Sequence, residues 1–153
     1  MAGLTPRVLQ RLRQARVARL ATADARGRPH VIPICFAAEA GAVYHAIDAK
    51  PKGRPAEGLR RVRNILENPR VALLVDHYEE DWRRLWFVLV RGRARLLHRG
   101  AARARGVRLL RRKYAQYRRG HRGAGKQGGG MLPEDALVIA IRPEAVFAWG
   151  AGR

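Results

Sequence analysis

The sequence has almost no cysteine and little lysine, and it lacks the long apolar runs of membrane proteins. Cys35 is the only cysteine, which excludes an internal disulfide and a cysteine-based metal cluster. No apolar run approaches the roughly 18 residues that a membrane-spanning helix needs. The first residues contain no apolar core of a signal peptide, so we expect a cytoplasmic protein without membrane association.

The common catalytic motifs are also missing. The five histidines show neither HxxH nor HExxH spacing, which argues against a zinc site. There is no GxSxG motif, and Cys35, in an apolar segment, is interpreted as an inert thiol. The glycines of Gly120–Gly130 lack the strand and helix that flank a phosphate-binding loop, so we predict a flexible loop there.

Charge of one sign dominates the chain. There are 32 basic and 12 acidic residues, a formal net charge of +20. Only four of the basic residues are lysines, and the arginines are scattered over every segment, which is typical of a GC-rich genome. A nucleic-acid-binding protein remains an alternative, but we expect only weak polyanion binding that is indifferent to sequence and sensitive to salt.

The length of 153 residues fits one domain spanning residues 1–153. Helix signals, such as Thr5 as a cap before Pro6, predict three helices. Turns at 24–29 and 41 predict two consecutive hairpins and a meander, with Pro33 in an edge strand. The predicted helices are 5–16, 57–68 and 100–117; the predicted strands are 17–23, 30–37, 42–47, 71–75, 85–97, 136–141 and 145–149.

These elements indicate a mainly β protein, a small antiparallel barrel with peripheral helices. The run 71–75 is apolar throughout and is predicted to be a central strand. The strand 85–97 is also strongly apolar up to Val90. In the last predicted helix, the expected inner face contains Val107, Leu110, Tyr114 and Tyr117.

A group of cations follows the strand 42–47. Lys50, Lys52 and Arg54 come directly after it, and the next helix carries Arg60, Arg61 and Asn64. Two of the four lysines lie within three positions, which codon bias does not explain. The pattern indicates an anion site, with a solvated basic loop as the alternative.

Several segments resemble the pyridoxamine-5′-phosphate-oxidase-like split β-barrel family. They are VARLATADARGRPHVIPICF, VYHAIDAKPK, NPRVALLVDHY and LWFVLVRGRARLL, over about residues 15–97. The similarity is greatest to the deazaflavin-dependent branch, which uses coenzyme F-420, and KYAQY at 113–117 also resembles this branch. The resemblance implies a six-stranded antiparallel split β-barrel that forms a homodimer, with the cofactor in the groove between the subunits.

The resemblance also implies a set of cofactor-binding residues. Lys50 and Lys52 would bind the phosphate, with further help from the next helix. Backbone and side chains at the end of the third strand would line the ring or ribityl chain, the neighbouring strand would form the floor of the ring, and residues of the partner subunit would cover it. The phosphate ligands would be Lys50 and Lys52, and the helpers on the next helix would be Arg60, Arg61 and Asn64. The residues lining the ring or ribityl chain would be His45, Ala46, Ile47 and Asp48, and those of the floor His30, Val31 and Pro33. The residues of the partner subunit would be Trp82, Arg84 and Trp86.

The expected activity is therefore an F-420-dependent oxidoreductase that reduces an activated C=C or C=N bond of a small organic substrate. The hydride chemistry belongs to the cofactor, so the protein needs no catalytic triad. Tyr44, Tyr78 and His77 are candidate proton donors, with bulk water as a substitute for them. The same fold would also suit an FMN-binding oxidase or reductase, or a non-catalytic carrier of flavin, haem or tetrapyrrole. The C-terminal substrate-binding segment of true pyridoxamine-phosphate oxidases is not recognisable, which argues against that activity.

Overall fold

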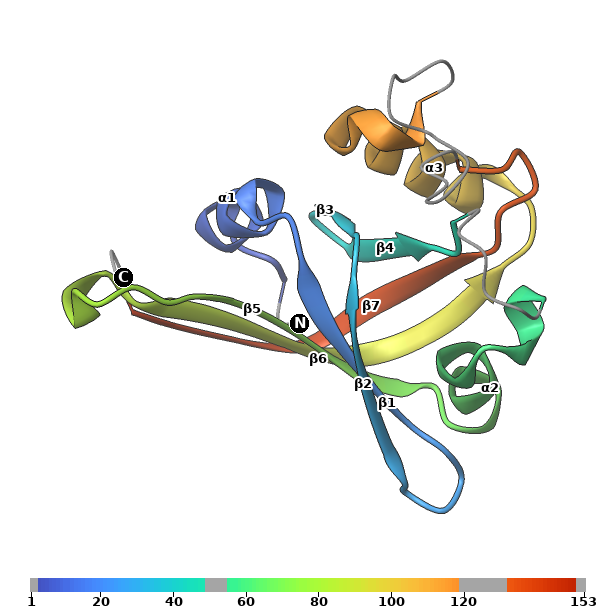
Figure 1. Ribbon diagram of the computed structural model, residues 1–153, viewed down its shortest axis with the longest axis horizontal. Helices are drawn as coiled ribbons and strands as arrows, with labels where there is room; N and C mark the ends of the chain where they lie inside the picture. Colours follow the sequence, from blue (N-terminus) through green and yellow to red (C-terminus); the bar gives the residue numbers. More distant parts are fainter. Residues whose placement is uncertain (1–2, 49–54, 119–131, 151–153) are drawn as a thin grey trace.

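A computed structural model describes residues 3–48, 55–118 and 132–150 of the chain (Figure 1). Seven strands pair in the order β2-β1-β5-β6-β7-β4-β3, and every pairing is antiparallel. The strands are β1 (Ala18–Ala23), β2 (Pro29–Ile34), β3 (Ala37–Glu39), β4 (Ala42–Ala46), β5 (Arg70–His77), β6 (Trp86–Leu97) and β7 (Val138–Gly150). The helices are α1 (Pro6–Gln14), α2 (Arg60–Glu67) and α3 (Ala101–Lys113), and the 3-10 turns are η1 (Ala56–Gly58), η2 (Trp82–Arg84) and η3 (Ala115–Tyr117).

The sheet curls because its two edges are consecutive in the chain. β2 and β3 are the first and last strands of the sheet, yet only Cys35 and Phe36 separate them. Three Cα–Cα steps join Ile34 to Ala37, so the edges approach within about 11 Å at this corner. The result is an incompletely closed barrel (Figure 1). The prediction of a mainly β protein is confirmed, and Pro33 does lie in an edge strand.

Three details of the predicted strands are wrong. The two early hairpins do not form a meander, because β1–β2 and β3–β4 lie at opposite ends of the sheet order. The segment predicted as one strand over 30–37 ends at Ile34, and a new strand begins at Ala37. The last two predicted strands are one continuous strand, β7, so the sheet has seven strands, whereas the resemblance implies six.

A bulge explains how β7 continues through a proline. Gly92 pairs with Pro143 and Arg91 pairs with Ala145, which leaves Glu144 without an opposite residue. Proline has no N–H for the ladder, and a bulge is one of the few interior places where a strand tolerates it. Gly92 is needed here because a Cβ at this position would clash with the backbone carbonyl of Arg142.

The helices cover the sheet through two apolar clusters (Figure 1). The larger cluster joins α1 and α2 to the barrel interior through side chains such as Leu12, Val62 and Leu73. The smaller one joins α3 to β4 and β7, and all four residues predicted for its inner face are buried there. Thr5 caps α1 by accepting a hydrogen bond from Val8 N at 3.3 Å, as predicted. On α2, Leu66 is 68% exposed, whereas the polar Asn64 is only 1% exposed.

The hydroxyl of Tyr114 ties α3 to the corner between the sheet edges. It accepts from Phe36 N at 3.1 Å, and it lies 2.8 Å from the carbonyl oxygen of Arg16 and 3.1 Å from that of Phe36. Burial raises the pKa of Tyr114 to about 12, so the hydroxyl stays protonated. One buried group thus connects three segments: the end of α3, the β2–β3 corner and the link from α1 to β1.

We therefore expect Tyr114→Phe to lower the free energy of unfolding by about 1–3 kcal/mol, because it leaves buried backbone groups without a hydrogen-bond partner. Urea denaturation at one fixed protein concentration measures this. Tyr78→Phe is the matched control: Tyr78 is 64% exposed, so its loss of a hydroxyl should change stability by less than about 0.5 kcal/mol. Equal effects of the two changes would contradict the role assigned to Tyr114.

Candidate functional site

The start of β2 and the first turn of α2 form a cationic edge, which we define as His30, Arg60 and Arg61. His30 and Arg60 line a cavity of about 250 Å³ together with Asp24, Arg28, Pro29 and Asn64. His30 and Arg60 were predicted from different segments of the sequence, and the fold brings them to one place.

Asp24 does not neutralise this edge. Its carboxylate accepts hydrogen bonds from the backbone N–H groups of Arg26 and Arg28 at 2.9 and 3.0 Å and from Arg28 Nε at 2.6 Å. These bonds, led by the one from the Arg28 backbone, lower the pKa of Asp24 and keep it ionised. The negative charge of Asp24 is thus paired with Arg28 inside the β1–β2 turn. It does not compensate the positive charges of Arg60 and Arg61 on α2.

Burial lowers the pKa of His30, and the charges of Arg60 and Arg61 lower it further. The imidazole is therefore neutral at pH 7. An anion bound beside it would offset the two guanidinium charges. The His30 pKa is thus a direct reporter of anion binding at this edge.

Arg61 is the inner cation of the edge. It is half-buried, and its Nε is buried without a hydrogen-bond partner among the described residues. Burial lowers the pKa of Arg61, while Asp48 and Tyr117 act in the opposite direction. The Tyr117 hydroxyl donates to Asp48 Oδ2 at 3.4 Å. Asp48, two residues after β4, therefore lies close to Arg61 of α2.

Asn64 has a structural role in this chain. Its side-chain Nδ2 donates to Thr22 Oγ1 at 2.9 Å, and both residues are buried. This hydrogen bond fastens α2 to β1. Asn64 borders the cavity, but its amide nitrogen is committed to the scaffold.

The residues predicted on β4 are mostly core residues. Ala46 and Ile47 are buried, and His45 donates from Nδ1 to the carbonyl oxygen of Cys35 at 2.9 Å. Tyr44, a candidate proton donor, is buried and donates to Glu39 Oε1 at 2.8 Å; its pKa rises to about 12, chiefly through burial. Only Asp48 of this segment reaches the cationic edge.

The remaining predicted residues either fall outside the described residues or lie away from the cationic edge. Lys50 and Lys52 fall outside the described residues. Val31 and Pro33 are exposed on the face of β2 opposite to His30, because side chains alternate along a strand.

Trp82, Arg84 and Trp86 lie at the far end of the β5–β6 hairpin (Figure 1). The eight residues of β5, about 23 Å at 3.3 Å per residue, separate them from α2. The side chain of Trp82 is 70% exposed. Arg84 forms an ion pair with Glu79 at 3.0 Å. The ring of Trp86 stacks with His77 and lies under the guanidinium of Arg11. Within one chain these aromatics do not reach the cationic edge.

Sequence reasoning missed an apolar patch on the outside of the sheet. Pairing registers place Leu74, Phe87, Leu89, Phe147 and Trp149 on the face opposite to the core; we call this the outer face. Phe147 and Trp149 are 45% and 47% exposed, and Phe87 stacks on Trp149 at 6.0 Å between ring centres. The signal was present in the sequence, because 71–75 is apolar at every position and is typical of a strand covered on both sides.

Comparison with known proteins identifies the family of the chain. The family model described as pyridoxamine 5′-phosphate oxidase matches residues 4–150. The chain belongs to this family. No curated protein sequence matches the chain. Membership covers the whole of the barrel and its three helices.

Solved structures of the same fold bind different cofactors. HutZ of Vibrio cholerae, a haem storage protein, has a TM-score of 0.68 and 18% identity, covering 96% of this chain and 94% of that one. An F420 reductase has a TM-score of 0.59 and 22% identity, covering 90% and 94%. An FAD-binding protein of Mesorhizobium loti has a TM-score of 0.61 and 22% identity, covering 95% and 94%. The fold is thus shared by proteins of flavin, deazaflavin and haem chemistry.

No helix among the described residues is both long and apolar enough to cross a bilayer. No three His, Cys, Asp or Glu side chains within residues 3–48, 55–118 and 132–150 come together as a metal site.

The structural role of Asn64 predicts that Asn64→Ala lowers the free energy of unfolding by about 1–3 kcal/mol, because the buried Thr22 hydroxyl loses its donor. Arg63→Ala, an exposed neighbour on the same helix, should change it by less than about 0.5 kcal/mol. Urea unfolding compares them. A fully stable Asn64→Ala protein with impaired cofactor binding would show that Asn64 serves the ligand instead.

Proposed function

We propose that this protein is an F-420-dependent oxidoreductase, which uses reduced deazaflavin to reduce an activated C=C or C=N bond of a small organic substrate. The observation that carries the proposal is the cationic edge at the start of β2 and α2. It brings Arg60 and the neutral His30 to one cavity, with Arg61 half-buried next to Arg60 on α2, on a fold whose family members bind flavins or deazaflavin.

The edge fits the phosphate of such a cofactor. Arg60 is exposed and Arg61 half-buried, so one can meet an incoming anion while the other holds it from below. Charge-assisted hydrogen bonds from guanidinium to phosphate are strong and geometrically specific. Lys50 and Lys52, six residues or fewer after β4, are proposed as further phosphate ligands from the sequence alone.

Charge favours F-420 over FMN as the cofactor. The phosphate of F-420 carries an acidic polyglutamate tail, whereas FMN ends at its phosphate. A chain with a net charge of +20 attracts the additional carboxylates over its whole surface. Binding of F-420 should therefore be tighter, and it should weaken more steeply with salt than binding of FMN.

The protein has few candidates for a proton donor. The bound deazaflavin supplies the hydride, so the chain must bind the cofactor, orient the substrate and exclude water. Tyr44 is a poor donor, because it is buried against α3 and its pKa is about 12. His77 stacks on Trp86 at the far end of β5, and Tyr78 directly follows it, so both could act only on a cofactor held by another subunit.

We propose a homodimer formed through the outer face. An exposed row of Leu74, Phe87, Phe147 and Trp149 on one sheet face is unusual for a monomer and typical of an interface. The apolar strands β5 and β6 have the composition of two-sided burial, yet one chain covers only one side. A second copy would cover the other side, and it would bring its own Trp82 and Trp86 to the cofactor.

Removing the cations of the edge tests the cofactor proposal. We expect Arg60→Gln/Arg61→Gln to raise the dissociation constant for oxidised F-420 by about a hundredfold or more, since each of the two lost guanidinium–phosphate bonds contributes about 1.5–3 kcal/mol. Fluorescence titration measures it. The matched control is Arg63→Gln/Arg70→Gln, which removes the same charge from exposed positions nearby. An equal loss of affinity in both variants would contradict a defined phosphate site.

An acidic residue in the outer face tests the dimer. Phe147→Glu would bury a carboxylate between subunits, at a cost of several kcal/mol, and should raise the dimer dissociation constant about a hundredfold or more. Sedimentation velocity at micromolar concentration distinguishes monomer from dimer. Leu66→Glu, on the exposed side of α2, is the control and should leave the dimer intact. A wild-type chain that sediments as a monomer would overturn the shared site.

A further inference from the structure

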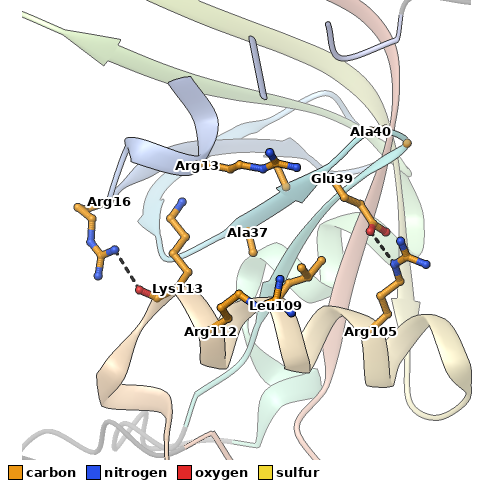
Figure 2. A pocket seen from close by; sticks show the side chains of 11 residues that line it. Arg13, Arg16, Ala37, Glu39, Ala40, Arg105, Leu109, Arg112 and Lys113 are labelled. Atoms are coloured by element: carbon orange, nitrogen blue, oxygen red, sulfur yellow. Dashed lines mark hydrogen bonds and ion pairs between the residues drawn. The ribbon is translucent and has the colours of Figure 1, made fainter. Parts of the chain in front are cut away.

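A second cationic cavity lies away from the edge, between α1, the β3–β4 hairpin and α3 (Figure 2). Its volume is about 970 Å³, at the upper end of the range for small-molecule sites. We call it the α1–α3 groove. Its cations are Arg13, Arg16, Arg105, Arg112 and Lys113, and its single acidic residue is Glu39.

The charges of this groove are largely uncompensated. Glu39 is used by Arg105 at 2.6 Å and by the Tyr44 hydroxyl at 2.8 Å. Arg13 and Arg112 form no ion pair or hydrogen bond with any described residue, and both side chains are exposed. Five cations against one carboxylate leave a net charge of +4 around one cavity.

Two of the cations are held in place without being neutralised. Lys113 Nζ donates to the carbonyl oxygen of Leu12 at 2.9 Å and lies 3.8 Å from the centre of the Phe36 ring. Arg16 Nη1 donates to the carbonyl oxygen of Lys113 at 3.0 Å, with its guanidinium 4.7 Å from the centre of the Tyr114 ring. Carbonyls and rings orient these side chains, yet they remove no charge. Such fixed positive charge is what a preorganised anion site requires.

The floor of the groove is apolar. Ala37, Ala38 and Leu109 line it, and Figure 2 shows Ala37 and Leu109 among the cations of the groove. A free inorganic ion would leave this floor empty. A ligand with an apolar frame and an anionic group would use both surfaces.

We propose that the α1–α3 groove binds an organic anion with a phosphate or with several carboxylates on an apolar frame. Arg13, Arg112 and Lys113 contact its charged group, and Ala37, Ala38 and Leu109 contact its frame. The site is separate from the cationic edge and does not depend on the identity of the cofactor. It gives the protein a second ligand, a substrate or an effector of this chemical class.

The protonation of Lys113 supports this assignment. Burial, followed by the charge of Arg16, lowers the pKa of Lys113 to about 8, while Cys35 acts in the opposite direction. A bound anion would raise this pKa again, because its negative charge would offset the positive charges of Arg16, Arg13 and Arg112 around the ammonium group. Binding near pH 8 should therefore take up protons, and affinity should fall as the pH rises.

The probe for the test is 1-naphthyl phosphate, which has an aromatic frame and a dianion, measured by isothermal titration calorimetry. Inorganic phosphate has only the charged group of the probe, and 1-naphthol has only its aromatic frame, so titrations with each measure the two contributions separately. We expect one probe molecule per chain, bound at least about tenfold more tightly than either half. Phosphate binding as tight as the whole probe would overturn the role of the apolar floor.

Variants locate the probe. Arg13→Gln/Arg112→Gln should raise its dissociation constant about tenfold to a hundredfold. Arg26→Gln/Arg108→Gln removes the same charge from exposed positions outside the groove, and Arg60→Gln/Arg61→Gln removes it from the cationic edge; each should change the constant by less than about threefold. Loss of binding in the edge variant alone would place the probe at the cofactor site, and equal losses in all three would show a general field. Either result overturns the proposal.

Two further measurements use the same assay. Between pH 7 and 9 the affinity should fall by up to about tenfold as Lys113 loses its proton, and Lys113→Met should remove this dependence. An unchanged pH profile in Lys113→Met would exclude Lys113 from the site. A short DNA duplex that displaces the probe at lower concentration, with the same dependence on Arg13 and Arg112, would make the groove a nucleic-acid surface and overturn the small-molecule assignment.

Discussion

The two-residue connection between β2 and β3 is the constraint on which the rest of the structure depends. It joins the two edges of a seven-stranded sheet, so the sheet must curl into a barrel. Tyr114 fixes this corner by hydrogen bonds to Phe36 and to the carbonyl of Arg16. The same contact sets the position of α3 relative to α1. The shape of the α1–α3 groove therefore follows from the closure of the barrel.

Curling also determines what one chain can and cannot bury. The inner side of the sheet is filled by Leu20, Leu73 and Val90, whereas Leu74, Phe147 and Trp149 remain on the outside. A strand with apolar residues on both faces has its lowest free energy when both are covered. In our proposal a second copy provides that cover. Cofactor binding and dimerisation would then be parts of one arrangement, since the cationic edge comes from one subunit and the aromatic cover from the other.

Local signals in the sequence predicted much of the fold. Thr5 with Pro6 marks the start of α1, and Pro33 marks an edge strand, because each of these effects acts within a few residues. The continuity of β7 was not predictable in this way, since it depends on a bulge opposite Gly92. The resemblance brought His30, Arg60, Arg61 and Asp48 to notice, and the fold places them close together. It could not reveal that Asn64 is committed to Thr22, 42 residues away in the sequence.

The α1–α3 groove was beyond sequence reasoning for a similar reason. Its cations come from positions 13 to 113 and look like the other scattered arginines. The one hint was Lys113, a lysine in a chain that nearly always uses arginine. Only the packing of α1 and α3 on β3 brings these five cations around one cavity and distinguishes them from those of a solvated surface.

The central claim is that this member of the family uses the deazaflavin. Parallel equilibrium titrations of the purified protein with oxidised F-420, FMN and haem, followed optically at physiological salt, test it most directly. The account predicts saturable binding of F-420, one molecule per chain, with an affinity higher than that of FMN and haem. Equal or tighter binding of FMN would make the protein a flavin enzyme or carrier, and preferential binding of haem would make it a haem-binding protein; either result would contradict the claim.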